Sequence, residues 1–387
     1  MIIVVAVCSF QRQKSKMANS VYRFISISLA ILLSSIVVLW TVRSMNKVKA
    51  LSFSAILYEV GIVTKPILAK VILPASVNNS NDSFHCKSAN LINMTFPVCL
   101  YDAKSDSVLS GPLLRDGTYF ESREVKSFLQ LLRSDQRLQL VDIGANVGIW
   151  SLPAARLTQV LSVEPNWRSI SRLAKAVDLG SVASNITLVH NAVSDVRTTL
   201  NMGVHPTNQG DAFLINATKC TKTPTRYLCN TIPAVDTILF DDLLPLMRSR
   251  SALVKVDVQG HEVKIFTDSS ASQFFDHVDV PLVFMEWVLC KRHSSKLVRR
   301  LLNFFYARNY AAFDLHNFKL KKQYRSWPWN VLFKKPPYIR FYMQDMIRPY
   351  NCRFWSAISV PGFDFRSRDY LKVAKIRNVI SDGPFLI

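Results

Sequence analysis

VDIGANVG, residues 141–148, is the stretch of sequence that decides the fold. It overlaps the end of the apolar run Leu138–Ile143 and the start of a helical pattern around Val147. A buried strand is therefore expected to end there and a helix to begin. Glycines at such a turn permit a positive φ and let a ligand approach the backbone, while the helix offers free N–H groups. The stretch therefore predicts a nucleotide-binding unit of strand, turn and helix.

A second acid supports this interpretation. Glu164 lies 22 residues beyond Asp142, at the end of the next apolar run. An acid about 20 residues beyond the first strand is placed to hydrogen-bond ribose hydroxyls. Pro165 favours an extended backbone at Glu164, as expected at a strand end.

The spacing of the glycines selects among nucleotides. It is Gly-x-x-x-Gly rather than Gly-x-Gly-x-x-Gly, and Asp142 lies two residues before the first glycine. A pyrophosphate would be repelled by that carboxylate, by about 4 kcal/mol per charge pair at 4 Å and an effective dielectric of 20. The ammonium and sulfonium of S-adenosylmethionine would be attracted, which disfavours an NAD-dependent oxidoreductase. The alternative for Asp142 is that it only caps the following turn.

Apolar runs alternate with helical patterns over the rest of the domain. We expect helices around Val147, Ile170, Val263 and Leu301, and a helix over 125–132 before the first strand. The expected strands are Leu138–Ile143, Val160–Glu164, Ile186–Asn191, Leu253–Val258, Leu282–Trp287, Ala311–Leu315 and Asn330–Phe333. Uniformly apolar strands that alternate with helices predict a parallel, doubly wound α/β sheet covered on both faces. Residues 210–233 are expected to be an insertion.

The order of several motifs resembles the FkbM-type methyltransferases. The motifs are VDIGANVG, SVEPN, ITLVHNAVSD, VDTILFDDLL, LVKVDVQGHE and LVFMEW, and they span about Leu138 to Leu332. The resemblance implies a class I Rossmann-like fold that uses S-adenosylmethionine, in most cases to methylate a hydroxyl oxygen. One departure is visible, because Gln259 replaces the acid of the family's DVEGHE motif.

The resemblance also implies roles for individual residues. Glu164 would hold the ribose, and Asn191 would lie near the adenine. The methionine end of the cofactor would be lined by Asp142, Gly144, Asn146 and Gly148.

The end of the fourth strand contains the candidate catalytic residues. Alternation within Leu253–Val258 places Lys255 and Asp257 on one face, where a buried lysine needs an acidic partner. An alkyl hydroxyl is a poor nucleophile, so we expect a base. Asp257 is the first candidate to orient the acceptor or take its proton, and His261 or Glu262 is the alternative base. His261 has a suitable reference pKa of about 6.5.

Each assignment has a simpler alternative. Glu262 can complement a helix dipole, His261 can be a hydrogen-bonded turn residue, and Glu286 can bond a backbone amide or line the acceptor pocket. No zinc-type spacing of Cys and His occurs, so no metal ligands are assigned. A divalent cation held by Asp257 and its neighbours is left open.

The N-terminal part predicts a membrane anchor. Phe24–Val42 is 19 residues without a charge, which at about 1.5 Å per residue spans a hydrocarbon layer of about 30 Å. Basic residues flank both ends, so a cytoplasmic N-terminus is only weakly favoured. A cleaved signal peptide is the alternative, but no small-x-small cleavage site follows Trp40.

Sequons and cysteines favour the secretory pathway. Sequons begin at Asn78, Asn81, Asn93, Asn185 and Asn216. Six cysteines follow the predicted anchor, an even number compatible with three disulfides, and nearest neighbours are the first guess for their pairing. The cysteines are Cys86, Cys99, Cys220, Cys229, Cys290 and Cys352. Reduced thiols in a cytosolic enzyme are the alternative.

The charge is strongly positive and unevenly distributed. The formal net charge is +21, and residues 291–387 hold 20 Lys and Arg against 5 Asp and no Glu, a net +15. This asymmetry suggests an acidic partner, such as a sulfated or uronic-acid glycan, a phosphorylated group or a lipid headgroup, with nucleic acid less expected. A basic surface that only aids solubility is the alternative.

Together these patterns predict a membrane-anchored enzyme of the ER or Golgi lumen or the cell surface. It would methylate a hydroxyl of a glycan or another secretory-pathway acceptor with S-adenosylmethionine. The alternative is a binding module that keeps the methyltransferase fold without turnover. The expected organisation is a cytoplasmic tail (1–23), a transmembrane signal anchor (24–42), a stem (43–118), the methyltransferase domain (119–345) and a basic extension (346–387).

Overall fold

The computed structural model describes residues 69–74, 84–215, 228–229, 232–321 and 323–336. The predicted anchor at 24–42, the basic extension at 346–387, Cys220 and Cys352 lie outside the described residues. Within the described part of the chain, every helix is too short or too polar to span a bilayer.

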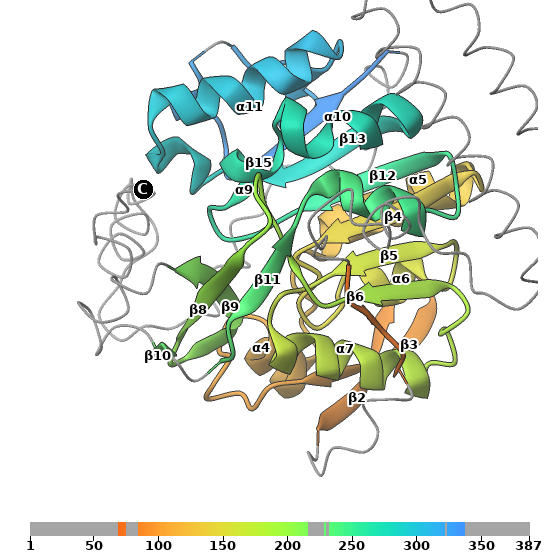
Figure 1. The fold of residues 1–387 in the computed structure, drawn as a ribbon. Coiled ribbons are helices and arrows are strands. Elements are labelled where there is room, and N and C mark those ends of the chain that lie inside the picture. Colours follow the sequence, from red (N-terminus) through yellow and green to blue (C-terminus); the bar gives the residue numbers. More distant parts are fainter. Residues whose placement is uncertain (1–68, 75–83, 216–227, 230–231, 322, 337–387) are drawn as a thin grey trace, which may run out of the picture. The chain divides into compact units, whose positions relative to one another are not determined.

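The main sheet has eight strands in the order β1-β6-β5-β4-β12-β13-β15-β14, and Figure 1 shows β15 and β13 at the top and β5 and β6 below. Neighbours from β6 to β13 are parallel, whereas β15 is antiparallel to both β13 and β14. The short β1 pairs antiparallel with β6. The strands are β1 (Val71–Ile72), β4 (Leu138–Ile143), β5 (Val160–Val163), β6 (Ile186–Val189), β12 (Ser251–Val256), β13 (Asp279–Glu286), β14 (Ala311–Phe313) and β15 (Asn330–Lys334).

Without β1, the strands follow the chain order 3-2-1-4-5-7-6 with an antiparallel seventh strand. This is the order of the class I methyltransferase fold, so the predicted α/β class is confirmed. All seven predicted strands are present: Leu138–Ile143 matches at both ends, and the ends of the other six differ by at most three residues from the predicted ones. The strand order places the ends of β4 and β12 side by side, where the order reverses and ligands bind.

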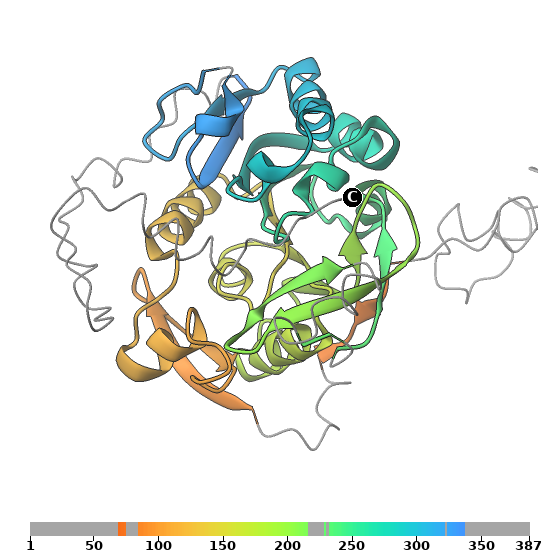
Figure 2. The ribbon, with the colours of Figure 1, turned by 90° about the vertical axis from the view of Figure 1, so that its left-hand side faces the viewer.

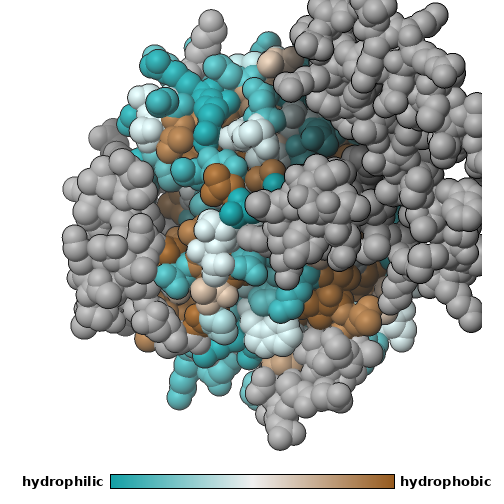
Figure 3. Space-filling view, in the orientation of Figure 1, coloured by the Kyte–Doolittle hydropathy of each residue, from teal (hydrophilic) through white to brown (hydrophobic). Residues whose placement is uncertain are grey.

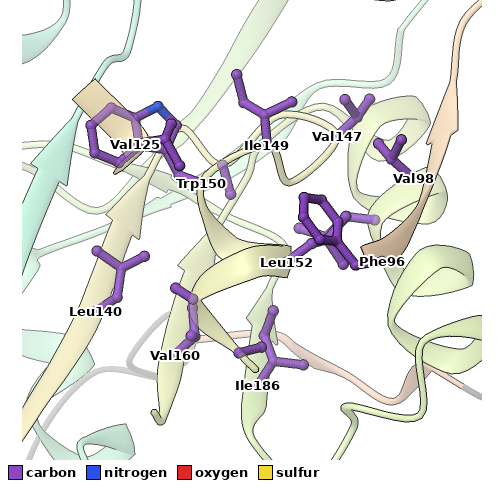
Figure 4. Close-up of a cluster of buried hydrophobic side chains, with 14 of the residues drawn as sticks. Phe96, Val98, Val125, Leu140, Val147, Ile149, Trp150, Leu152, Val160 and Ile186 are labelled. Atoms are coloured by element: carbon purple, nitrogen blue, oxygen red, sulfur yellow. The ribbon is translucent and has the colours of Figure 1, made fainter. Parts of the chain in front are cut away.

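Alternate residues of the strands enter two hydrophobic clusters on opposite faces of the sheet. In β4, Leu138 and Leu140 belong to one cluster, whereas Val141 and Ile143 belong to the other. The first cluster, drawn in part in Figure 4, is covered by α5 (Ser122–Ser134), α6 (Ser151–Ala154) and α7 (Trp167–Leu179). The second is covered by η2 (Phe240–Leu246), α9 (Glu262–Ile265), α10 (Asp268–His277) and α11 (Ser295–Ala307). The sheet is therefore doubly wound, as predicted.

The C-terminal part of the predicted stem belongs to the folded domain, which corrects the boundary at residue 118. β2 (His85–Leu91) and β3 (Met94–Leu100) form an antiparallel hairpin, and α4 (Ser110–Asp116) follows it. Phe96, Val98 and Leu100 are buried in the first cluster, because every second side chain of β3 faces α7. The sequons and cysteines around the hairpin made this stretch resemble a tethering stem in the sequence.

Of the disulfides predicted between nearest-neighbour cysteines, one is present and another is not. Cys86 and Cys99 form a disulfide across the β2–β3 hairpin, as predicted. Cys290 is instead a buried free thiol, which corrects its predicted pairing with Cys352. Its thiol lies inside the domain and donates to Oε2 of Glu262 at 3.6 Å.

A second sheet stands outside the main one, with green strands in both ribbon views (Figure 1, Figure 2). The predicted insertion at 210–233 therefore begins earlier, at Thr199, and contributes a long hairpin of β8 and β9. The strands of the second sheet are β7 (Ala192–Val193), β8 (Thr199–His205), β9 (Asn208–Ile215), β10 (Leu228–Cys229) and β11 (Val235–Ile238).

Candidate active site

A cleft opens at the carboxyl ends of β4, β5 and β12, and β9 covers part of it. About 770 Å³ of space lies between its walls, part of it open to solvent. Six of the residues predicted from the sequence line it together: Gly144, Asn146, Glu164, Asn191, Asp257 and His261. The structure places the other three, Asp142, Gly148 and Glu262, outside its lining.

The turn after β4 has a backbone shape that requires glycine at its first position. Gly144 has a φ of +82°, and a Cβ there would lie 1.8 Å from the carbonyl oxygen of Asp257. Asn146 also has a positive φ, of 50°, and its N–H donates to Oε2 of Glu164 at 2.8 Å. The turn therefore joins the ends of β4, β5 and β12 into one rigid unit.

Glu164 is buried except where it lines the cleft. Its Oε1 accepts a hydrogen bond from the N–H of Asn166 at 2.7 Å, in addition to the bond from Asn146. Burial raises the pKa of Glu164 to about 7, although these two hydrogen bonds act in the opposite direction. Each carboxylate oxygen keeps a second lone pair, so Glu164 can accept two further hydrogen bonds from a diol.

Asp142 lies beneath the cleft and pairs with Lys255, which corrects its predicted place beside the cofactor. Nζ of Lys255 lies 3.3 Å from Oδ1 of Asp142 and 3.9 Å from Oδ2 of Asp257, and it donates to the carbonyl of Gly144 at 2.7 Å. Ser151 donates to the other oxygen of Asp142. Burial alone would lower the pKa of Lys255, but the adjacent carboxylates raise it above its usual value. Asp142 thus fixes Lys255, and Lys255 fixes the turn.

Replacing Lys255 with Met should destabilise the domain by about 3–5 kcal/mol, because Asp142 is then buried without a counter-charge. The free energy of unfolding in urea checks this. Lys296→Met, at an exposed position of α11, is the matched control and should change the free energy by less than about 0.5 kcal/mol. A loss at Lys255 no larger than at Lys296 would show that the ion pair contributes nothing.

Gly148 has a packing role in the structure, not a place in the cleft. Its φ is +90°, and a Cβ there would lie 2.4 Å from Cδ1 of Leu173 in α7. The glycine therefore allows the chain after β4 to pack closely against α7. Asn191 lines the cleft, but its side chain accepts from the N–H of Lys70 and donates to the carbonyl of Asp236. Its amide therefore holds β1 and β11 beside the site.

Asp257 follows β12 and presents its carboxylate to the cleft, with 24% of the side chain exposed. Gln259, at a φ of 55°, donates from Nε2 to Oδ1 of Asp257 at 2.9 Å. Gly260, at a φ of 94°, completes the tight turn. The residue that departs from the family motif therefore keeps a direct contact with the candidate catalytic carboxylate.

The two alternative bases are less suited to proton transfer. His261 lines the cleft, but burial lowers its pKa to about 4, and its Nε2 lies 2.9 Å from Oγ of Ser194. Oε1 of Glu262 accepts hydrogen bonds from the N–H groups of Val258 and Gly260 and so holds the turn. Asp257 alone among the three combines an accessible carboxylate with a place at the strand end.

One acidic residue of the cleft, Glu121, was missed in the sequence. Glu121 lines it from the start of α5, and its Oε2 accepts a hydrogen bond from Nε1 of Trp150 at 2.8 Å. Burial raises the pKa of Glu121 to about 7, and the charge of Asp257 adds to the effect. No local pattern marks Glu121, because it lies before the helical repeat and 136 residues from Asp257.

The strand order and the cleft at the ends of β4, β5 and β12 define a cofactor-binding domain of the class I methyltransferase type. Comparison with known families agrees, since residues 142–311 match the Methyltransferase FkbM domain. The resemblance found in the sequence is confirmed over that range, and the match supports S-adenosylmethionine as the cofactor. No curated protein matches the chain.

Several solved structures are similar in part. Precorrin-6y C5,15-methyltransferase from Geobacter metallireducens shares 15% identity at a TM-score of 0.30, over 56% of this chain and 89% of its own. A putative O-methyltransferase from Klebsiella pneumoniae shares 15% identity at a TM-score of 0.28, over 54% and 78%. The O-methyltransferase TomG from Streptomyces achromogenes, in complex with SAM, shares 11% at a TM-score of 0.30, over 57% and 83%. The fold is assigned from the strand order, not from these scores.

Proposed function

We propose that the protein is an S-adenosylmethionine-dependent O-methyltransferase. The observation that carries this proposal is that Glu164 and Asp257 face one cleft from the ends of two strands on either side of β4. One carboxylate is placed to bind a ribose and the other to meet an acceptor hydroxyl. The glycine turn at 144–146 lies between them, as a bound nucleoside requires.

The charge of the cleft favours this cofactor. Glu121, Glu164 and Asp257 line it, and Lys255 is the one lining residue with a permanent positive charge. Lys255 is itself paired with Asp142 and Asp257. A ligand that carries an ammonium and a sulfonium fits these surroundings, whereas a pyrophosphate would be repelled. The preference for a positively charged cofactor, predicted from Asp142, thus comes from the carboxylates that line the cleft.

Methyl transfer needs an activated methyl group and an oriented acceptor hydroxyl. When bound, S-adenosylmethionine supplies a methyl group activated by a positive sulfur. Asp257 orients the acceptor hydroxyl in line with that methyl group and accepts its proton. The oxygen–carbon bond forms as the sulfur–carbon bond breaks, which leaves S-adenosylhomocysteine, a methyl ether and a proton on Asp257. β9 shields the reacting atoms, because Phe213 and Leu214 line the cleft.

The acceptor is proposed to be a neutral hydroxyl compound, such as a glycan, in the secretory pathway. The disulfide between Cys86 and Cys99 supports an oxidising compartment. An acidic partner would contact a different face, because hydrophilic residues gather over α11 (Figure 3) and Lys296, Arg299 and Arg300 are exposed there. The membrane anchor belongs to the same proposal and rests on the sequence of residues 24–42.

Calorimetric titration of the full-length protein with S-adenosylmethionine tests the cofactor. Incubation with S-adenosylmethionine labelled in its methyl group, and with glycan and protein fractions from cells that lack the protein, tests transfer. Absence of binding at millimolar cofactor would end the proposal. Binding without transfer to any fraction would favour the alternative, a binding module in which Gln259 replaces the family's acid.

The affinity for S-adenosylmethionine should depend on pH through Glu164, whose pKa is about 7. The carboxylate form accepts hydrogen bonds from both ribose hydroxyls, and the protonated form loses acceptor capacity. Affinity is therefore highest above pH 7 and falls as the pH decreases through about 7. Titrations between pH 5.5 and 8.5 check this. Glu164→Gln, which cannot ionise, should bind more weakly and with a flatter pH profile, and an equally steep profile would exclude Glu164.

A further inference from the structure

Three carboxylates from two neighbouring strand ends meet behind the cleft. Asp257 follows β12, Glu262 begins α9 and Glu286 ends β13. One oxygen from each lies within 4.8 Å of the others. Two ligands on opposite sides of one cation are about 4.0–5.2 Å apart, given metal–oxygen distances of about 2.0–2.6 Å. The three oxygens can therefore contact a single ion with little movement.

The carboxylate of Glu286 gives an independent reason to place a ligand there. Its Oε2 is buried and has no hydrogen-bond partner among the described residues. A buried carboxylate oxygen without a partner is costly, and such a group requires an explanation. Burial first, and then the charges of Asp257 and Glu262, raise the pKa of Glu286 well above its usual range.

The surroundings hold the other two carboxylates in place. Oδ1 of Asp257 accepts a hydrogen bond from Gln259, and Oε1 of Glu262 accepts from two backbone N–H groups. Hydrogen bonds of this kind orient the ligands of metal sites. The second oxygen of each has only a weak or distant contact: the Cys290 thiol lies 3.6 Å from Oε2 of Glu262, and Nζ of Lys255 lies 3.9 Å from Oδ2 of Asp257. Lys255 lies closer to Asp142, at 3.3 Å, so it neutralises this cluster only in part.

We infer that Asp257, Glu262 and Glu286 bind one divalent cation beside the acceptor end of the cleft. A set of carboxylate oxygens selects hard cations such as Mg²⁺, Mn²⁺ or Ca²⁺. The cation reaches the cluster through the cleft, because Asp257 lines it. The role of the ion rests on the proposed function: it binds the acceptor hydroxyl and lowers its pKa, which makes the oxygen a better nucleophile. Its binding does not depend on that function.

Mn²⁺ alone is the probe for this site. Titration of the full-length protein, followed by the electron paramagnetic resonance signal of free Mn²⁺, should show one ion bound per chain and its displacement by excess Mg²⁺ or Ca²⁺. Glu286→Gln should weaken Mn²⁺ binding by at least about 10-fold, the lower bound seen when even indirect metal contacts are lost. Glu262→Gln is the second variant, in case the first does not fold.

Asp276→Asn is the matched control, because this carboxylate in α10 is 61% exposed and lies outside the cluster. It should leave Mn²⁺ affinity unchanged. Calorimetry with S-adenosylmethionine on the same samples separates the two proposals. A protein that binds S-adenosylmethionine but no Mn²⁺ at millimolar concentration, or variants that bind Mn²⁺ as tightly as the wild type, would overturn this inference alone. Mn²⁺ binding without cofactor binding would overturn the proposed function instead.

Discussion

Asp257→Asn should lower the rate of methyl transfer by roughly 10²–10⁴-fold, the range for loss of a positioned acid–base group. The amide keeps the shape of the side chain and its contact with Gln259, but it cannot accept the acceptor's proton. Binding of S-adenosylmethionine should change little, because the carboxylates that face the ribose and the turn are unchanged. The reduced rate therefore appears in transfer and not in cofactor affinity.

Single-turnover incorporation of the labelled methyl group, with cofactor affinity measured by calorimetry, checks the prediction for Asp257. Asp116→Asn is the control, because this half-exposed carboxylate of α4 lies outside the cleft. If Asp257→Asn transferred methyl groups at the wild-type rate, neither proton acceptance nor acceptor orientation could be assigned to this residue. His261 would then be the next residue to replace.

Glu164→Ala should weaken S-adenosylmethionine binding by about 100-fold or more. A hydrogen bond to a charged group contributes about 1.5–3 kcal/mol, and two ribose hydroxyls would lose their acceptor. The substitution also removes the acceptor for the N–H groups of Asn146 and Asn166, which shape the turn. The loss should therefore exceed that of Glu164→Gln, which keeps one acceptor oxygen.

Calorimetric affinities for the wild type and both Glu164 variants check this order. Glu124→Gln is the control, because this residue lies in the first turn of α5 and outside the cleft lining. An affinity of Glu164→Ala within threefold of the wild type would mean that the ribose is held elsewhere. The proposed position of the cofactor would then be wrong, whatever the fold.

The surroundings of the two carboxylates suit the different tasks proposed for them. Glu164 is enclosed by backbone donors, which suits a fixed acceptor. Asp257 is partly exposed and faces Lys255, which suits a group that exchanges protons. Glu121, Glu262 and Glu286 lie around Asp257, and burial followed by nearby carboxylate charge raises the pKa of each. The strongly basic chain thus contains a cleft whose charged lining is mainly acidic, so the net charge of the chain does not indicate the charge of the cleft.

The sequence determined the strands, the turn and the class of the cofactor. Buried parallel strands such as Leu138–Ile143 are continuous apolar runs, so they stand out without any knowledge of their neighbours. The turn at 144–146 and the acid at Glu164 lie at fixed distances along the chain from those strands. Local spacing was enough to place both at the strand ends.

Only the tertiary structure decided which charges meet. Asp142 and Lys255 are 113 residues apart in the chain and pair because β4 and β12 are neighbours in register. Glu121 approaches Asp257 from the start of α5, which no local pattern indicates. Glu286 was recognised at the end of a predicted strand, but only the packing of β13 beside β12 shows that it meets Asp257. The hairpin at 85–100 likewise joins the core through contacts with α7. Periodicity reports which side chains are buried, but it does not report their partners, because partners are set by how separate elements pack.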